Sequence, residues 1–183
     1  MNMKAVVDWG MVIAKFGAIF AALIGVIGAF LQFYVQKRNE RTTVNKAILS
    51  EISRLLHVLC KHRIWWEGCK ANNNTDLPIV PFSMDVYDNF LKNIGDLHRS
   101  YASEAVSFYG YIKFLNALQK LRADHIAIGK EQVFVDTYLA SLSNIVSRHY
   151  NKFDAAFTKY AIELPVIDQK CLQPTLHTHA NPA

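Results

Sequence analysis

The sequence predicts an all-α protein in which one N-terminal transmembrane helix continues into a cytoplasmic antiparallel helical bundle. An uncharged apolar block occupies positions 16–35, and apolar residues beyond it recur at intervals of three and four. No stretch alternates in the way a half-buried strand does. Charged residues make up 19% of the 183-residue chain, below the ~25% of ordinary soluble domains, as expected when one segment is built for lipid.

The pattern predicts four parts. These are a short extracytoplasmic N-terminus (1–10), a transmembrane helix (11–36), a cytoplasmic helical bundle (37–164) and an irregular C-terminal tail (165–183). The part outside the membrane has the length of one ordinary domain.

The membrane helix is predicted from the segment 16–35, which has no charge and only Gln32 as a strongly polar residue. At ~1.5 Å per residue it spans about 30 Å, the thickness of the hydrocarbon core. A cleaved signal peptide would have an apolar region of only ~7–15 residues before a small-residue cleavage site. We therefore expect an uncleaved signal-anchor with a single pass.

Basic residues set the expected orientation. Lys37, Arg38 and Arg41 flank the C-terminal end of the apolar block, whereas Lys4 and Lys15 flank its other end. The positive-inside rule then places the N-terminus outside and the C-terminal domain in the cytoplasm of a bacterial inner membrane. The net charge of +5 is accordingly assigned to lipid contact and not to nucleic acid.

Small residues form a stripe along the predicted membrane helix. Gly17, Ala21, Gly25 and Ala29 recur at intervals of four, and Gly28 widens the stripe. Small side chains let a second helix approach closely in lipid, so we expect helix–helix packing here. Ordinary glycine and alanine usage in membrane helices is the alternative.

The soluble part is predicted to contain further helices over 84–94, 100–126 and 130–164. The first helix is expected to end at Gly68, a helix to begin after Ser83, and Pro165 to stop the last helix. The predicted core positions are Val44, Ile48, Ile52, Leu55, Leu59 and Trp66; Tyr101, Ala105, Phe108, Ile112, Leu115, Leu118 and Arg122; and Val135, Tyr138, Leu142, Ile145, His149, Phe153, Ala156 and Tyr160.

No catalytic motif is present: the sequence has no P-loop, dinucleotide-binding turn, HExxH pair or GxSxG elbow. Cys60, Cys69 and Cys171 fit no disulfide framework, so reduced thiols are expected. His57 and Cys60 share a helical face, but two ligands do not make a zinc site. We therefore expect no enzyme activity, no cofactor, no bound metal and no small-molecule substrate.

Four aromatic residues are predicted to lock the corner between the short helix and the helix that follows. These are Tyr87, Phe90, Phe108 and Tyr109. A shallow binding groove at this corner is the alternative interpretation.

Short motifs in the first two thirds of the chain carry a resemblance. They are AILSEI at 47–52, Pro81, Tyr-Asp-Asn at 87–89, Ile-Gly-Asp-Leu at 94–97 and Val-Ser-Phe-Tyr at 106–109. The chain resembles small bacterial single-pass membrane proteins that have an N-terminal anchor, a cytoplasmic helical domain and no assigned activity. The resemblance implies the architecture and supplies no function.

The expected function is therefore non-enzymatic. The chain would self-associate or join a larger membrane complex through its anchor and bundle, with the bilayer, itself or another membrane protein as partners. One alternative is a membrane effector or sensor, for example in phage defence, that oligomerises and perturbs the membrane. A second alternative is a metal-binding protein that uses His57 and Cys60.

Overall fold

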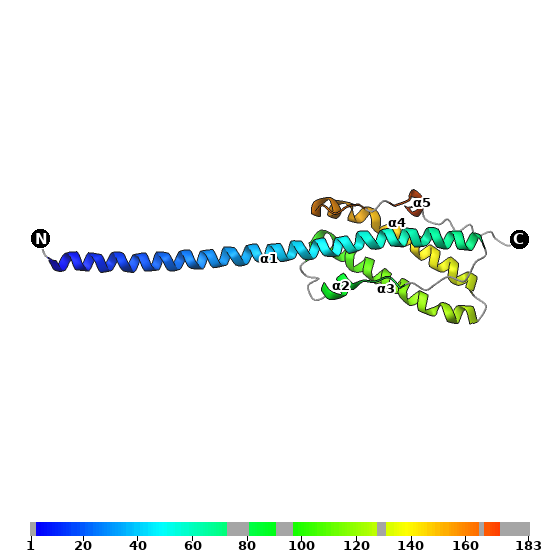
Figure 1. Cartoon of the computed structure of the whole chain (residues 1–183), viewed down its shortest axis with the longest axis horizontal. Coiled ribbons are helices and arrows are strands. Elements are labelled where there is room, and N and C mark those ends of the chain that lie inside the picture. Colours follow the sequence, from blue (N-terminus) through cyan, green and yellow to red (C-terminus); the bar gives the residue numbers. More distant parts are fainter. Residues whose placement is uncertain (1–2, 73–80, 91–96, 128–130, 165–166, 173–183) are drawn as a thin grey trace. The chain divides into compact units, whose positions relative to one another are not determined.

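A computed structural model describes residues 3–72, 81–90, 97–127, 131–164 and 167–172 (Figure 1). Within these ranges the chain is all-helical and has no strand. The helices are α1 (Met3–Ala71), α2 (Asp85–Phe90), α3 (Arg99–Ala127), α4 (Glu131–Tyr160) and α5 (Gln169–Leu172). The predicted all-α class is thus confirmed for the described residues.

The chain divides into two compact units, Met1–Thr43 and Val44–Ala183. The division falls inside α1, so the first unit is the N-terminal part of one helix. The second unit contains the rest of α1 and all the other helices, and Figure 1 shows α3 and α4 beside this second part of α1.

One hydrophobic core holds the second unit together. It draws on α1 from Val44 onward, α3, α4 and the buried Cys171 of α5. Every predicted core position is buried except Leu118 and Tyr160, which are half-buried and pack against the same core. The spacing of apolar residues therefore predicted correctly which face of each long helix turns inward.

Two predicted helix ends are wrong. α1 passes through Gly68 to Ala71, because one exposed glycine costs only about 1 kcal/mol in a helix that long. α4 ends at Tyr160 and not at Leu164. Ala161 adopts a left-handed conformation (φ 52°), and the Ile162 amide donates to the Phe157 carbonyl, a C-terminal cap that usually needs glycine.

The expected irregular tail also contains a helix. α5 is one short turn, and the Asp168 carboxylate accepts a hydrogen bond from the Lys170 amide at its start (2.9 Å). Cys171 is fully buried, so this part of the tail belongs to the core. The remainder of the predicted tail, 173–183, lies outside the described residues.

Candidate functional site

The first unit exposes an apolar helical surface. Each residue from Phe20 to Thr43 is exposed, and the large apolar side chains Ile24, Val26 and Phe30 are 68%, 68% and 69% exposed. Among the described residues, one helix is long and apolar enough to cross a membrane, and none of its apolar window is buried. A core helix of a soluble protein has the same composition, but it would be covered by protein.

The predicted small-residue stripe lies on this exposed surface. Gly17, Ala21, Gly25, Gly28 and Ala29 are all exposed. A methyl group added at any of the three glycines would meet nothing within 4 Å. At these three glycines the stripe therefore has room for another helix.

Lys37, Arg38 and Arg41 follow the apolar surface and are exposed, as are the residues around them. Thr42 and Thr43 turn their hydroxyls back to the Arg38 and Asn39 carbonyls (2.9 and 3.0 Å), which keeps their polar groups within the helix. The three basic residues thus form an exposed group directly after the apolar surface.

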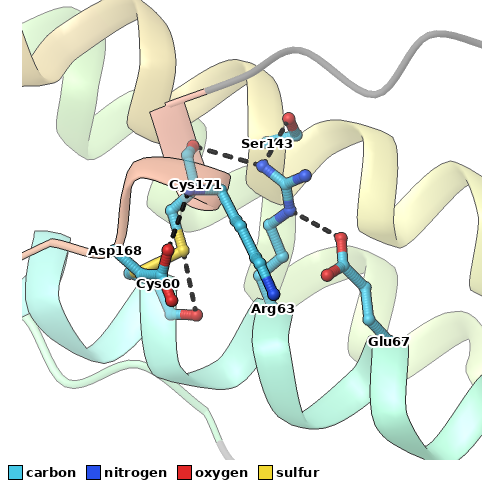
Figure 2. Close-up of a disulfide and its surroundings, with 7 residues drawn as sticks. Cys60, Arg63, Glu67, Ser143, Asp168 and Cys171 are labelled. Atoms are coloured by element: carbon cyan, nitrogen blue, oxygen red, sulfur yellow. Dashed lines mark hydrogen bonds and ion pairs between the residues drawn. A yellow bond between two sulfur atoms is a disulfide. The ribbon is translucent and has the colours of Figure 1, made fainter.

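The second feature is a disulfide between α1 and α5. Cys60 and Cys171 are bonded, with Cα atoms 5.7 Å apart and 111 positions apart in the chain (Figure 2). This corrects the expectation of reduced thiols for these two residues, while Cys69 remains free. The pair could not be predicted from the sequence, because its members are remote and only the tertiary fold brings them together.

Arg63 ties three helices together beside this disulfide. Its guanidinium donates to the Cys171 carbonyl (3.2 Å), the Ser143 hydroxyl (2.9 Å) and the Glu67 carboxylate (2.8 Å), as Figure 2 shows. Arg63 is 5% exposed. A buried charge with several hydrogen bonds fixes geometry, so α5 is held in place by polar contacts as well as by the covalent bond.

The metal-site alternative is not supported by this arrangement. Cys60 is committed to the disulfide and has no thiolate to offer beside His57. Within the described ranges, no group of three histidine, cysteine or acidic side chains converges.

The predicted aromatic corner contains a stacked pair. The Tyr87 and Tyr109 rings lie 3.9 Å apart at 18°, and Phe108 meets Tyr109 edge-on. The side chain of Phe90 lies outside the described residues. The packing of Tyr87 on Tyr109 has a structural cause, because a buried glutamate of α1 binds both residues.

That acid, Glu51, was missed by the sequence analysis. It is 5% exposed, and its carboxylate accepts hydrogen bonds from the Val86 and Tyr87 amides (both 3.0 Å) and from the Tyr109 hydroxyl (2.7 Å). Burial, together with this hydrogen bond and the nearby Glu51 charge, raises the pKa of Tyr109. Glu51 thereby caps α2 from another helix. Glu51 lies three positions after Ile48, on the buried face of α1, and this spacing could have indicated that the carboxylate is buried and needs a partner.

A second missed polar residue, Asn45, lies one turn away from the basic flank. Its side-chain oxygen accepts from the Tyr101 hydroxyl and from the His98 amide at the start of α3. Asn45 and Glu51 thus position α2 and α3 on α1. Both residues act as structural connectors between helices.

Two histidines of the second unit lie among aromatic side chains, His62 half-buried and His149 fully buried. The Trp66 indole donates to His62 (2.8 Å), and burial lowers the pKa of His62 to about 4. Burial also lowers the pKa of His149, against the opposing effect of Glu104, which lies 2.5 Å from it. Both rings contact aromatic neighbours and so contribute to packing.

A pocket of about 360 Å³ opens between α3 and α4. Arg148 donates to the Tyr111 hydroxyl across it (2.9 Å), and Phe114 and Ile145 supply apolar walls. Its serine hydroxyls, Ser141 and Ser147, donate to carbonyls of their own helix. The lining groups therefore contain no nucleophile paired with a base.

No family model, curated protein or solved structure matches this chain.

Proposed function

We propose that the chain is a non-enzymatic single-pass protein of a bacterial inner membrane that self-associates or joins a membrane complex. The observation that carries this proposal is the exposed apolar surface of α1 from Phe20 onward. Burying a side chain such as leucine or phenylalanine is worth about 1.5–3 kcal/mol, so a surface of this length in water would be strongly unfavourable. A bilayer supplies the matching environment.

The proposed role outside the membrane rests on the second unit. We propose that its long helices form an antiparallel bundle, because α3 and α4 are joined by only three residues. Its buried polar groups link helix to helix, as a rigid interaction module requires. Assembly within the membrane would use the small-residue stripe, where Gly17 and Gly25 leave a helix backbone accessible.

Two features bear on orientation, and they point in opposite directions. The basic flank at Lys37, Arg38 and Arg41 favours a cytoplasmic second unit. A buried Cys60–Cys171 disulfide is typical of an oxidising compartment. We give the basic flank more weight, because it acts during insertion, before the domain folds, and because burial of Cys60 and Cys171 shields their disulfide from soluble reductants.

The orientation is testable with a reporter that is active only in the cytoplasm. Fused after Ala183, it should be active, and fused before Met1 it should be inactive. An inactive reporter after Ala183 together with an active one before Met1 would place the second unit on the oxidising side. That result would reverse the proposed orientation.

The assembly role is tested by the native mass of the full chain in mild detergent. Gly25→Ile adds bulk on the small-residue stripe and should lower the native mass. Ile27→Phe adds bulk about half a turn away and should leave it unchanged. Equal effects of the two changes, or a monomer in the unmodified chain and no captured membrane partner, would contradict the proposal.

A further inference from the structure

The outer face of α3 is apolar where a soluble helix is normally polar. Val106, Phe114 and Leu121 are 45%, 49% and 47% exposed. Gly110 and Ala117, between them in the sequence, are also exposed. These five residues follow one another at intervals of four, four, three and four, so they lie on one stripe, opposite the buried stripe of the same helix. We call this stripe the outer face of α3.

The neighbouring helix shows that this is not a general property of the unit. In the part of α4 whose side chains are described, 133–160, the exposed residues are mostly polar: Thr137, Asn144, Arg148, Asn151, Lys152, Asp154, Thr158 and Lys159, beside the apolar Val133 and Ala155. α4 thus has one apolar face and one polar face, as expected for a helix that is covered on one side. α3 has apolar residues on both sides, as expected for a helix that is covered on both.

The size of the outer face limits what can cover it. From Val106 to Leu121 it is about 22 Å long at ~1.5 Å per residue, the length of a single helix contact. A stable complex between free partners buries roughly 1,200–2,000 Å², more than one helix stripe supplies. The face therefore suits a partner that is already held nearby, and two copies anchored in one membrane meet that condition.

Shape and charge are compatible with a second copy. Gly110 has open space where a side chain would be, and Ala117 adds only a methyl group, so two such helices can approach closely between the larger side chains. Lys113 borders the face and is paired with Asp88 at 3.8 Å, which reduces its repulsion from a second copy. Lys120 is exposed at the edge, where a long side chain can turn toward water.

We propose that the outer face of α3 is a homotypic interface, where the soluble units of two membrane-anchored copies meet. The proposal rests on the anchor proposed above, because tethering supplies the local concentration that a small interface requires. It adds a contact outside the membrane to the one expected between the anchor helices.

Site-specific cross-linking of the full chain in native membranes tests this. Cys69 is replaced by serine, and Ala117→Cys places one reactive thiol on the outer face. A short bis-maleimide should give a cross-linked product of twice the chain mass. Asp154→Cys, an exposed position on the polar side of α4, is the matched control and should give little product.

A second substitution tests whether the apolar side chains stabilise the interface. Adding Phe114→Glu to the Ala117→Cys chain should reduce the dimer product at least about fivefold, while Thr137→Glu on α4 should not. Retained solubility and an unchanged helical signal after detergent extraction would show that the variant is folded.

Several outcomes would overturn the proposal. They are absence of a 117–117 product in protein that fractionates with the membrane, an equal product from position 154, or a cross-link to a different protein or to lipid only. The anchor proposal fails separately, by loss of the chain from the membrane fraction.

Discussion

The two parts of α1 have the same backbone conformation and opposite relations to their surroundings. From Phe20 to Thr43 each side chain is exposed, whereas from Val44 onward buried residues return every three or four positions. Apart from Gln32, the first part is apolar all round up to Val35, and the second part is apolar on one face. One uninterrupted helix therefore contains a fully exposed segment and a covered one, and only the distribution of its side chains marks the change.

This difference explains where the polar residues of α1 are used. In the second part, buried Asn45, Glu51 and Arg63 bind groups on other helices. In the first part, Gln36 binds Glu40, its own neighbour one turn on (3.1 Å). The buried polar residues of the second part thus hold other segments against α1, whereas Gln36 in the first part binds a residue of its own helix.

We expect the largest difference in unfolding free energy between substitutions of two glutamates of α1, Glu51 and Glu40. Glu51→Ala would leave the Val86 and Tyr87 amides and the Tyr109 hydroxyl without their acceptor, at an expected cost of about 3–5 kcal/mol in the unfolding free energy of the second unit. Glu40→Ala, exposed in the first part, should change it by less than about 0.5 kcal/mol. Denaturant unfolding of the detergent-solubilised chain measures both, and similar losses would mean that Glu51 is not the connector described above.

Two leucines provide a comparison of the same substitution in both parts. Leu55 is fully buried, so Leu55→Ala should cost about 2–5 kcal/mol of unfolding free energy through lost packing and a cavity. Leu31 is 56% exposed, and Leu31→Ala should leave the unfolding midpoint of the second unit nearly unchanged. A midpoint shift for Leu31→Ala as large as that for Leu55→Ala would contradict the division of α1 into two parts.

The disulfide gives a smaller effect that depends on oxidation state. In oxidised protein, Cys171→Ser should lower the unfolding free energy by about 2–4 kcal/mol, because the bond closes a loop of 111 positions in the unfolded chain. In fully reduced protein the same variant should differ little from the unmodified chain. Equal losses in both states would assign the effect to packing of residue 171 and not to the covalent bond.

The smallest expected effect is on pH dependence. The folded pKa of His62, about 4, lies below its unfolded value of 6.5, so the unfolded chain binds the proton first. Stability contributed by the neutral ring is complete at pH 7 and is lost as pH falls from 6.5 toward 4. Allowing for partial exposure, we expect a loss of about 1 kcal/mol between pH 7 and pH 5. His62→Gln should flatten this part of the pH–stability profile, and an unaltered slope would remove His62 as its source.

Much of the fold could be predicted from the sequence, because apolar spacing is a local signal. The stripe from Val44 to Trp66 and those of α3 and α4 were predicted correctly on that basis. The ends of α1 and α4 could not be predicted in the same way. Gly68 was tolerated inside a long helix, and Ala161 adopts a conformation that its side chain does not favour.

The polar connectors and the disulfide depend on distant contacts. Glu51 is bound by groups 35 to 58 positions away, and Cys60 by one 111 positions away. No local pattern encodes such partners. A glutamate or asparagine at core spacing is a sign that a partner exists, and the fold alone says which one it is.

The central claim is that the first part of α1 crosses a membrane, and its most direct test is extraction of membranes with alkaline carbonate. The unmodified full chain should stay in the pellet. Leu23→Arg with Ile27→Arg places two charges in the exposed apolar surface, at an expected cost of about 5–7 kcal/mol for insertion, and should move the chain to the soluble fraction. Ser50→Arg with Ala71→Arg adds the same charges at exposed positions of the second part and should leave the chain in the pellet. Release of the unmodified chain by carbonate, or retention of the Leu23→Arg, Ile27→Arg chain in the pellet, would contradict the account.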